Sequence, residues 1–150
     1  MIRIIVIGSP FLGDDISYRV MDEIKPTLQK KYSDLDICYL DRPGMQLVNE
    51  LYNVKHAIVI DALLSGSKPG TILRLDVDEL DKSDKPLSSH DLSVPQAIKL
   101  AQQLAVIPEQ LFIIGISINL DQELKPQQFN QTCTQLLAEL DSICTQVSTD

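Results

Sequence analysis

Short apolar runs rich in β-branched residues alternate along this chain with segments of helical spacing, and this alternation constrains the fold more than any other feature. The runs lie at residues 2–8, 35–40, 57–60 and 111–116. Their length and composition are typical of parallel strands that are buried on both faces of a sheet. Apolar residues at helical spacing lie between and after them, at residues 15–30, 45–52, 93–104 and from Pro126 onward. The alternation predicts an α/β fold, a three-layer αβα sandwich with a mostly parallel central sheet.

Two further segments complete the predicted fold. Pro69 and Gly70 form a turn signal, and residues 71–77 after them resemble an antiparallel or edge strand. Residues 78–89 are rich in Asp, Lys and Ser and are expected to form an exposed loop. The 150 residues contain no internal repeat and no linker, which predicts a single domain over residues 1–150.

The last two predicted helices carry their own start signals. Ser93 and Gln96 have the spacing of a capping box, with Pro95 in the first turn. The final helix begins at Pro126, and one stripe of its side chains is expected to face the sheet. That stripe consists of Phe129, Cys133, Leu136, Leu137, Leu140, Cys144 and Val147.

The three cysteines show neither a CxxC pair nor the spacing of a metal-binding finger. Cys133 and Cys144 fall on one face of the last helix, but their Cα atoms are expected about 16 Å apart at the helical rise per residue. A disulfide requires a separation of less than about 7 Å. We therefore expect Cys38, Cys133 and Cys144 to act as small buried hydrophobic residues.

The composition excludes several functional classes. A net charge of −8 argues against binding to nucleic acid or to an anionic membrane surface. Met1 leads directly into the first strand without a signal peptide, and no apolar run approaches the roughly 18 residues of a membrane span. The expected location is cytoplasmic.

Acidic residues follow two of the predicted strands. Asp14 and Asp15 come after the first strand, and Asp61 comes directly after Ile60, where we expect the third strand to end. The carboxyl ends of parallel strands meet at one edge of a sheet, which is where functional groups gather in open α/β folds. A buried carboxylate without compensation costs several kcal/mol, so Asp61 is the sharpest candidate. A structural explanation exists for each acid, as a helix N-cap or as an acceptor in a turn.

A histidine in a later loop is the candidate nitrogen ligand. His90 precedes the helix that starts near Ser93, whereas His56 precedes the third strand and belongs to the opposite edge of the sheet. A loop histidine can also be merely solvated, so the pairing with Asp61 carries the argument. Two carboxylates and one imidazole with open positions suit a divalent borderline metal such as nickel or zinc. Asp61, His90 and either Asp14 or Asp15 are therefore expected to converge on one ion.

Two other motifs fail on the residues present. Ser9 with Asp61 and His90 could suggest a serine hydrolase, but Gly8-Ser9-Pro10 is not a G-x-S-x-G nucleophile elbow. A dinucleotide-binding fold requires G-x-G-x-x-G after the first strand, and only Gly8 and Gly13 occur there.

The order and spacing of several segments resemble the hydrogenase maturation proteases. The segments are residues 8–15, Asp41-Arg42-Pro43-Gly44, Ile60-Asp61-Ala62, Pro69-Gly70-Thr71, Ser88-Ser89-His90 and residues 111–116. The family consists of endopeptidases that trim the C-terminus of the large subunit of nickel–iron hydrogenases. The resemblance implies the same activity here, on a large-subunit precursor that already carries nickel.

The resemblance also implies residue roles. Asp61, His90 and one acid after the first strand are expected to bind the precursor's nickel and to form the catalytic site. The Gly-Asp-Asp pattern selects Asp15, whereas an ungapped match to the downstream Tyr-Arg-Val selects Asp14. Asp41 lies in a segment that contacts the substrate in the family. Here that segment reads Asp-Arg-Pro-Gly instead of the usual Asp-Gly-Gly-Thr, and Ser9 replaces an asparagine.

Two alternatives share every proposed ligand. One is a metallohydrolase that acts on a small molecule. The other is a non-catalytic binding module that recognises the immature subunit without cutting it.

Overall fold

The protein folds around one sheet whose strands run in the order β2-β1-β3-β5-β4. The computed structural model describes residues 1–8, 15–76, 93–119 and 121–148. The strands are β1 (Ile2–Gly8), β2 (Leu35–Asp41), β3 (His56–Leu63), β4 (Ile72–Leu75) and β5 (Gln110–Ser117). The helices are α1 (Ile16–Lys31), α2 (Gly44–Leu51), α3 (Val94–Gln103) and α4 (Pro126–Ser148).

The pairing of the strands confirms the mostly parallel sheet. β1 pairs in parallel with β2 and with β3, and β3 pairs in parallel with β5. β4 pairs antiparallel with β5 at the edge of the sheet, as its turn signal predicted, although it is shorter than residues 71–77. The exposed loop predicted for residues 78–89 lies outside the described residues.

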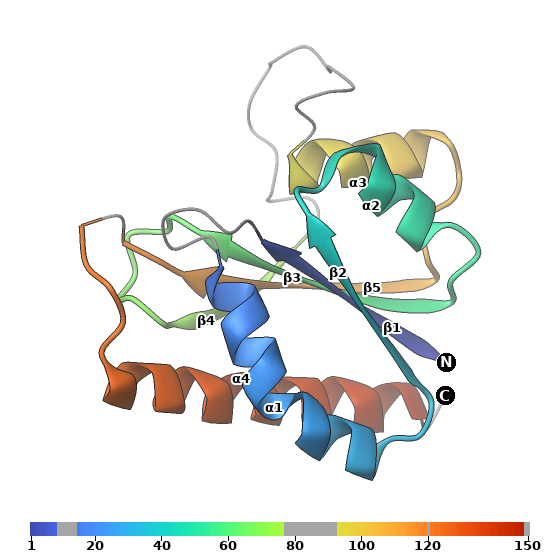
Figure 1. The fold of residues 1–150 in the computed structure, drawn as a ribbon. Helices are drawn as coiled ribbons and strands as arrows, with labels where there is room; N and C mark the ends of the chain where they lie inside the picture. Colours follow the sequence, from blue (N-terminus) through green and yellow to red (C-terminus); the bar gives the residue numbers. More distant parts are fainter. Residues whose placement is uncertain (9–14, 77–92, 120, 149–150) are drawn as a thin grey trace.

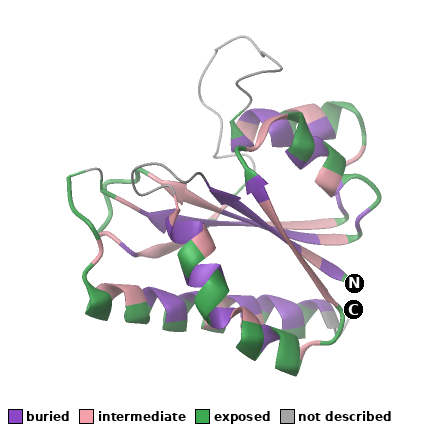
Figure 2. Cartoon of the chain, in the orientation of Figure 1, coloured by how far each residue is buried: buried purple, intermediate pink, exposed green. Residues whose placement is uncertain are grey.

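The helices cover both faces of the sheet. α1 and α4 lie on one face, and α2 and α3 lie together on the other (Figure 1). Side chains of a strand alternate between faces, so Ile4 and Val6 pack on the α1 and α4 side while Ile5 and Ile7 pack on the α2 and α3 side. Buried residues line the inner sides of these layers (Figure 2). The predicted three-layer αβα sandwich is confirmed.

The predicted helix signals are present in α3 and α4. The Ser93 hydroxyl accepts from the Gln96 N–H at 3.4 Å, and the Gln96 side chain accepts from the Ser93 N–H at 3.0 Å. Most of the apolar stripe of α4 is buried, and the remaining two members, Phe129 and Leu137, pack partly buried against the same core. Cys133 and Cys144 belong to this core, whereas Cys38 is only half-buried.

β3 continues past the point at which we expected it to end. The sequence suggested that the strand stops at Ile60 and leaves Asp61 in a loop. In the structure β3 extends to Leu63, and Asp61 lies opposite Gly115 in the ladder with β5. Main-chain pairing does not depend on the polarity of the side chain, so a half-buried acid can stay in register.

The Pro-Gly-Thr turn between β3 and β4 has a packing role. Gly70 is buried with a φ of +87°, and a Cβ at this position would lie 2.5 Å from the Thr132 hydroxyl of α4. That hydroxyl donates to the carbonyl of Gly70 at 2.8 Å. The Gly70 N–H in turn donates to the carbonyl of Ser117 at 2.8 Å. Glycine is required here because α4 packs directly against the turn.

Candidate functional site

The carboxyl ends of β1 and β2 form the first part of the candidate site. Gly8 and Asp41, the last residues of the two strands, are register partners in the parallel ladder. The chain then turns at Arg42, whose N–H donates to the carbonyl of Gly8 at 3.2 Å. α2 begins at Gly44, so the segment after β2 is tied to β1 before it enters the helix.

Tyr18 of α1 joins the same two strand ends from one face of the sheet. Its hydroxyl donates to the carbonyl of Leu40 and lies 3.4 Å from the carbonyl of Gly8. Its ring meets that of Tyr39 edge to face, with 5.3 Å between the ring centroids. Burial, followed by the nearby carboxylate of Asp41, raises the pKa of Tyr18, so the hydroxyl stays a hydrogen-bond donor at neutral pH.

Asp15 occupies the N-cap position of α1 without using its side chain as a cap. Its carbonyl accepts from the Arg19 N–H at 3.0 Å, as the main chain of an N-cap does. Its half-buried carboxylate accepts no capping bond from the helix. The capping explanation that the sequence allowed therefore does not account for this carboxylate. Asp14, the other acid of the pair, lies outside the described residues.

Asp61 is the acid of β3. Its Oδ1 accepts from the N–H of the next residue, Ala62, at 2.9 Å. Neighbouring residues of a strand point to opposite faces of the sheet, and Ile60 packs on the α1 and α4 side. Asp61 therefore belongs to the face covered by α2 and α3. Asp41 belongs to the opposite face, because its neighbour two positions earlier, Tyr39, packs against the core beneath α1. Asp41 and Asp61 therefore approach the same edge of the sheet from different sides.

The three-ligand metal site stays a prediction. Within the described residues, no group of three or more His, Cys, Asp and Glu side chains could hold a metal ion. His90 and Asp14 lie outside those residues, so the structure describes only Asp15 and Asp61 of the four candidate ligands. His56 is the first residue of β3 and belongs to the amino-terminal edge, as the sequence indicated.

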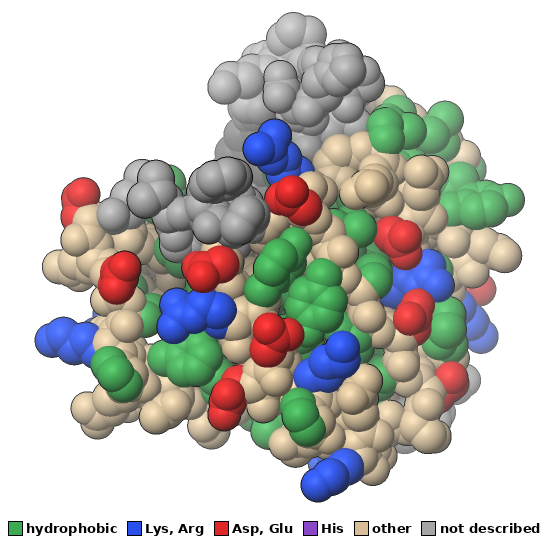
Figure 3. Space-filling model, viewed as in Figure 1, with side chains coloured by type: hydrophobic (Ala, Val, Ile, Leu, Met, Phe, Trp, Pro, Cys, Tyr) green, Lys and Arg blue, Asp and Glu red, His purple; other side chains and the backbone are tan. Residues whose placement is uncertain are grey.

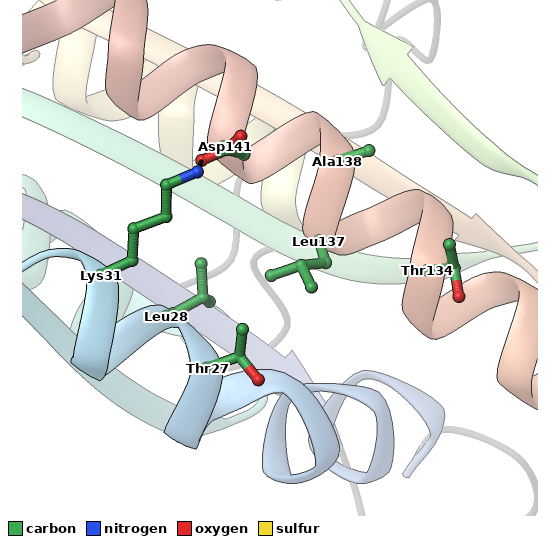
Figure 4. A pocket seen from close by; sticks show the side chains of 7 residues that line it. All are labelled: Thr27, Leu28, Lys31, Thr134, Leu137, Ala138 and Asp141. Atoms are coloured by element: carbon green, nitrogen blue, oxygen red, sulfur yellow. Dashed lines mark ion pairs between the residues drawn. The ribbon is translucent and has the colours of Figure 1, made fainter.

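A shallow pocket lies elsewhere on the molecule, between α1 and α4. It has a volume of about 270 Å³. Leu28 and Leu137 point into it, and the ion pair between Lys31 and Asp141 lies at one end (Figure 4). Its α1 residues come from the C-terminal half of the helix, far from the N-terminus at which Asp15 lies. This pocket is therefore separate from the candidate site.

Two residues of the site were not identified from the sequence. Tyr18 and Arg42 act through main-chain contacts with Gly8, a residue distant in sequence from Arg42, and side-chain patterns do not reveal such contacts. The substitution of arginine for the family's glycine at position 42 was the one available signal. In the structure Arg42 has a φ of +77°, a conformation that favours glycine.

The family model described as hydrogenase maturation protease matches residues 19–128, most of the chain. The chain belongs to this family. The match confirms the resemblance that the sequence indicated. The chain is also 31% identical over 90 residues to the hydrogenase expression/formation protein HupD of Thiocapsa roseopersicina. This alignment covers 56% of this chain and 41% of HupD. The aligned part thus spans less than half the length of this relative.

Solved structures of the family share the fold. The hydrogenase maturating endopeptidase HybD from E. coli has a TM-score of 0.66 at 21% identity, over 94% of this chain and 92% of that one. The maturation protease HycI from Thermococcus kodakarensis has a TM-score of 0.64 at 19% identity, over 95% and 90% of the two chains. At these identities the comparison establishes the architecture.

Figure 3 shows a face on which acidic and basic side chains are interspersed, without a broad basic patch. Among the described helices, none combines the length and the apolar character that crossing a membrane requires.

Proposed function

We propose that this protein is a metal-dependent endopeptidase that removes the C-terminal extension of a nickel–iron hydrogenase large-subunit precursor. The match of the family model over residues 19–128 is the observation that carries this proposal. The positions of Asp15 and Asp61 support it, because both acids lie at or near the carboxyl ends of neighbouring strands. The proposed location of the reaction is the cytoplasm.

The site residues have distinct proposed roles. Asp15, Asp61 and His90 bind the nickel ion of the precursor, with Asp14 as the alternative to Asp15. The Asp15 carboxylate is suited to this role because no helix N–H engages it as a cap. The Asp61 carboxylate accepts the Ala62 N–H, and carboxylate oxygens are common ligands of divalent metal ions in proteins. Asp41 contacts the substrate beside the end of β2.

The nickel ion belongs to the substrate in this proposal. A divalent ion can polarise the carbonyl of the scissile peptide bond or lower the pKa of a bound water that attacks it. Either route adds water across that bond and releases the extension with a new amino terminus. Three protein ligands leave open positions for the precursor's own groups, unlike the closed shell of a structural zinc site.

The origin of the metal gives a direct test. The protein is treated with a chelator, desalted, and offered a nickel-loaded precursor and a nickel-free precursor in separate reactions. Cleavage of the loaded precursor alone supports nickel delivered by the substrate. Equal cleavage of both, restored only when metal is added to the enzyme, contradicts it and points to a self-contained metallohydrolase.

A further inference from the structure

Arg42 combines a demanding backbone conformation with a side chain that is available for binding. Its φ of +77° lies in the region that few residues other than glycine adopt. Pro43 follows it, and a proline disfavours most conformations of the preceding residue except extended ones. Backbone outliers of this kind persist where the surrounding structure holds them and are concentrated at functional sites.

The surrounding contacts hold the backbone of Arg42 from both sides. The Arg42 N–H donates to the carbonyl of Gly8 at 3.2 Å. The Tyr18 hydroxyl contacts the same carbonyl and that of Leu40, and so holds the ends of β1 and β2 together. On the other side, the carbonyl of Pro43 accepts from the Leu47 N–H at 2.9 Å in the first turn of α2. The position of Arg42 is therefore set in advance of any binding event.

The side chain of Arg42 is exposed. Within the described residues it forms no ion pair, whereas Arg3 and Arg74 are both paired with carboxylates. A guanidinium presents a planar fork of donors that matches a carboxylate with two parallel hydrogen bonds. In a chain with a net charge of −8, this cation directly follows Asp41, the residue proposed to contact the precursor.

We propose that Arg42 is a specificity-determining residue that binds a carboxylate of the precursor's C-terminal extension. This inference rests on the proposed function and adds one substrate feature to it. The carboxylate has two possible sources, an acidic side chain of the extension or the C-terminal carboxylate of the precursor. Arg42 acts in binding and takes no part in the bond cleavage.

Four variants separate the charge of Arg42 from its backbone strain. Arg42→Gln removes the charge and keeps a side chain at positive φ, whereas Arg42→Gly removes both. Arg42→Lys keeps the charge but loses the planar fork. Lys55→Gln is the matched control, because it removes one exposed positive charge just before β3, at the amino-terminal edge of the sheet.

The experiment measures KM and kcat for precursor cleavage at low and high salt, together with direct binding of the precursor. Arg42→Gln and Arg42→Gly are expected to raise KM by about tenfold or more, the effect of losing a charged hydrogen bond, with kcat nearly unchanged. Both should weaken the salt dependence of KM, and Arg42→Lys should restore part of the affinity. Lys55→Gln should match the wild type.

Two altered precursors identify the carboxylate. One has the acidic residues of its extension changed to amides, and the other has an amidated C-terminus. With the wild-type enzyme, the precursor that lacks the contacted carboxylate should have a KM raised as much as the Arg42→Gln variant raises the KM of the unaltered precursor. With the Arg42→Gln variant, the same altered precursor should give no further increase in KM. If the wild type cleaves the precursor and Arg42→Gln has the same KM and salt dependence, Arg42 has no such role. If the wild type neither binds nor cleaves it, the proposed function fails and this inference fails with it.

Discussion

Leu63 occupies the space that a side chain at Gly115 would need. A Cβ at Gly115 would lie only 1.7 Å from the Cδ2 of Leu63, and Gly115 is the register partner of Asp61. The Leu63 side chain therefore packs directly over the main chain of β5 opposite Asp61, the acid proposed to belong to the active site. A side chain at position 115 would disturb that geometry from a neighbouring strand.

Gly115→Ala is expected to lower the free energy of unfolding by about 1–3 kcal/mol, because the added methyl group forces Leu63 to move. Urea unfolding of the two single variants and of Gly115→Ala with Leu63→Ala tests the contact directly. Truncating Leu63 makes room for the new methyl group, so the double variant should lose less stability than the sum of the two single losses. Strictly additive losses would show that the two residues do not compete for this space.

Asp15→Ala is expected to abolish processing while changing the free energy of unfolding by less than about 0.5 kcal/mol. The reason is that the Asp15 carboxylate makes no capping bond in α1. Ser93→Ala provides the comparison in stability, because the Ser93 hydroxyl does cap α3 and its loss should cost about 1 kcal/mol. Asp14→Ala should retain processing. The reverse order of activities would assign the ligand role to Asp14.

Asp61→Asn is expected to lower processing by about 100-fold or more, since an amide lacks the charge that favours binding of a divalent ion. The amide oxygen can still accept the Ala62 N–H, so thermal unfolding should stay close to that of the wild type. Turnover near the wild-type rate in this folded variant would remove Asp61 from the proposed site.

The stability of the protein is expected to fall as the pH rises from about 9 to about 12. Burial, reinforced by the Glu50 carboxylate, raises the pKa of Cys38 to about 12, and burial raises that of Cys144 to about 11, from an ordinary value of 9.0. In this pH range the unfolded thiols lose their protons while the folded thiols keep them. The two thiols therefore contribute fully to the free energy of unfolding below about pH 9, and this contribution is lost as the pH rises toward their folded-state pKa values.

Urea unfolding at about pH 8 and about pH 10.5 measures this loss, with Cys144→Ala as the comparison. The variant should be less stable at both pH values but should lose less stability between them, because one shifted thiol is absent. An equal loss in the two proteins would contradict the role given to Cys144.

The sequence predicted the parts of the fold that depend on side-chain pattern. The buried β-branched runs identified the parallel strands, and Pro69-Gly70 marked the antiparallel edge strand β4. The Ser93 capping box appears as predicted. These features are local or periodic, so neighbouring residues alone contain the signal.

The remaining features depend on contacts between distant segments. β3 extends past Asp61 because its main-chain hydrogen bonds to β5 do not depend on the type of side chain. The side-chain pattern alone could not show this extension. Tyr18 and Arg42 act on the main chain at Gly8, and no local pattern predicts such a link. The positive φ of Arg42 is likewise set by its surroundings. The grouping of His90 with the two acids stays a prediction.

Mass spectrometry of a nickel-loaded hydrogenase large-subunit precursor incubated with this protein shows whether the protein cleaves the precursor. We expect a precursor shortened at its C-terminus, together with the released extension as a separate peptide. Incubation with Asp61→Asn in place of the wild type should leave the precursor at full length. A loaded precursor that binds the wild-type protein and keeps its full mass would contradict the proposed endopeptidase activity and indicate a non-catalytic binding module.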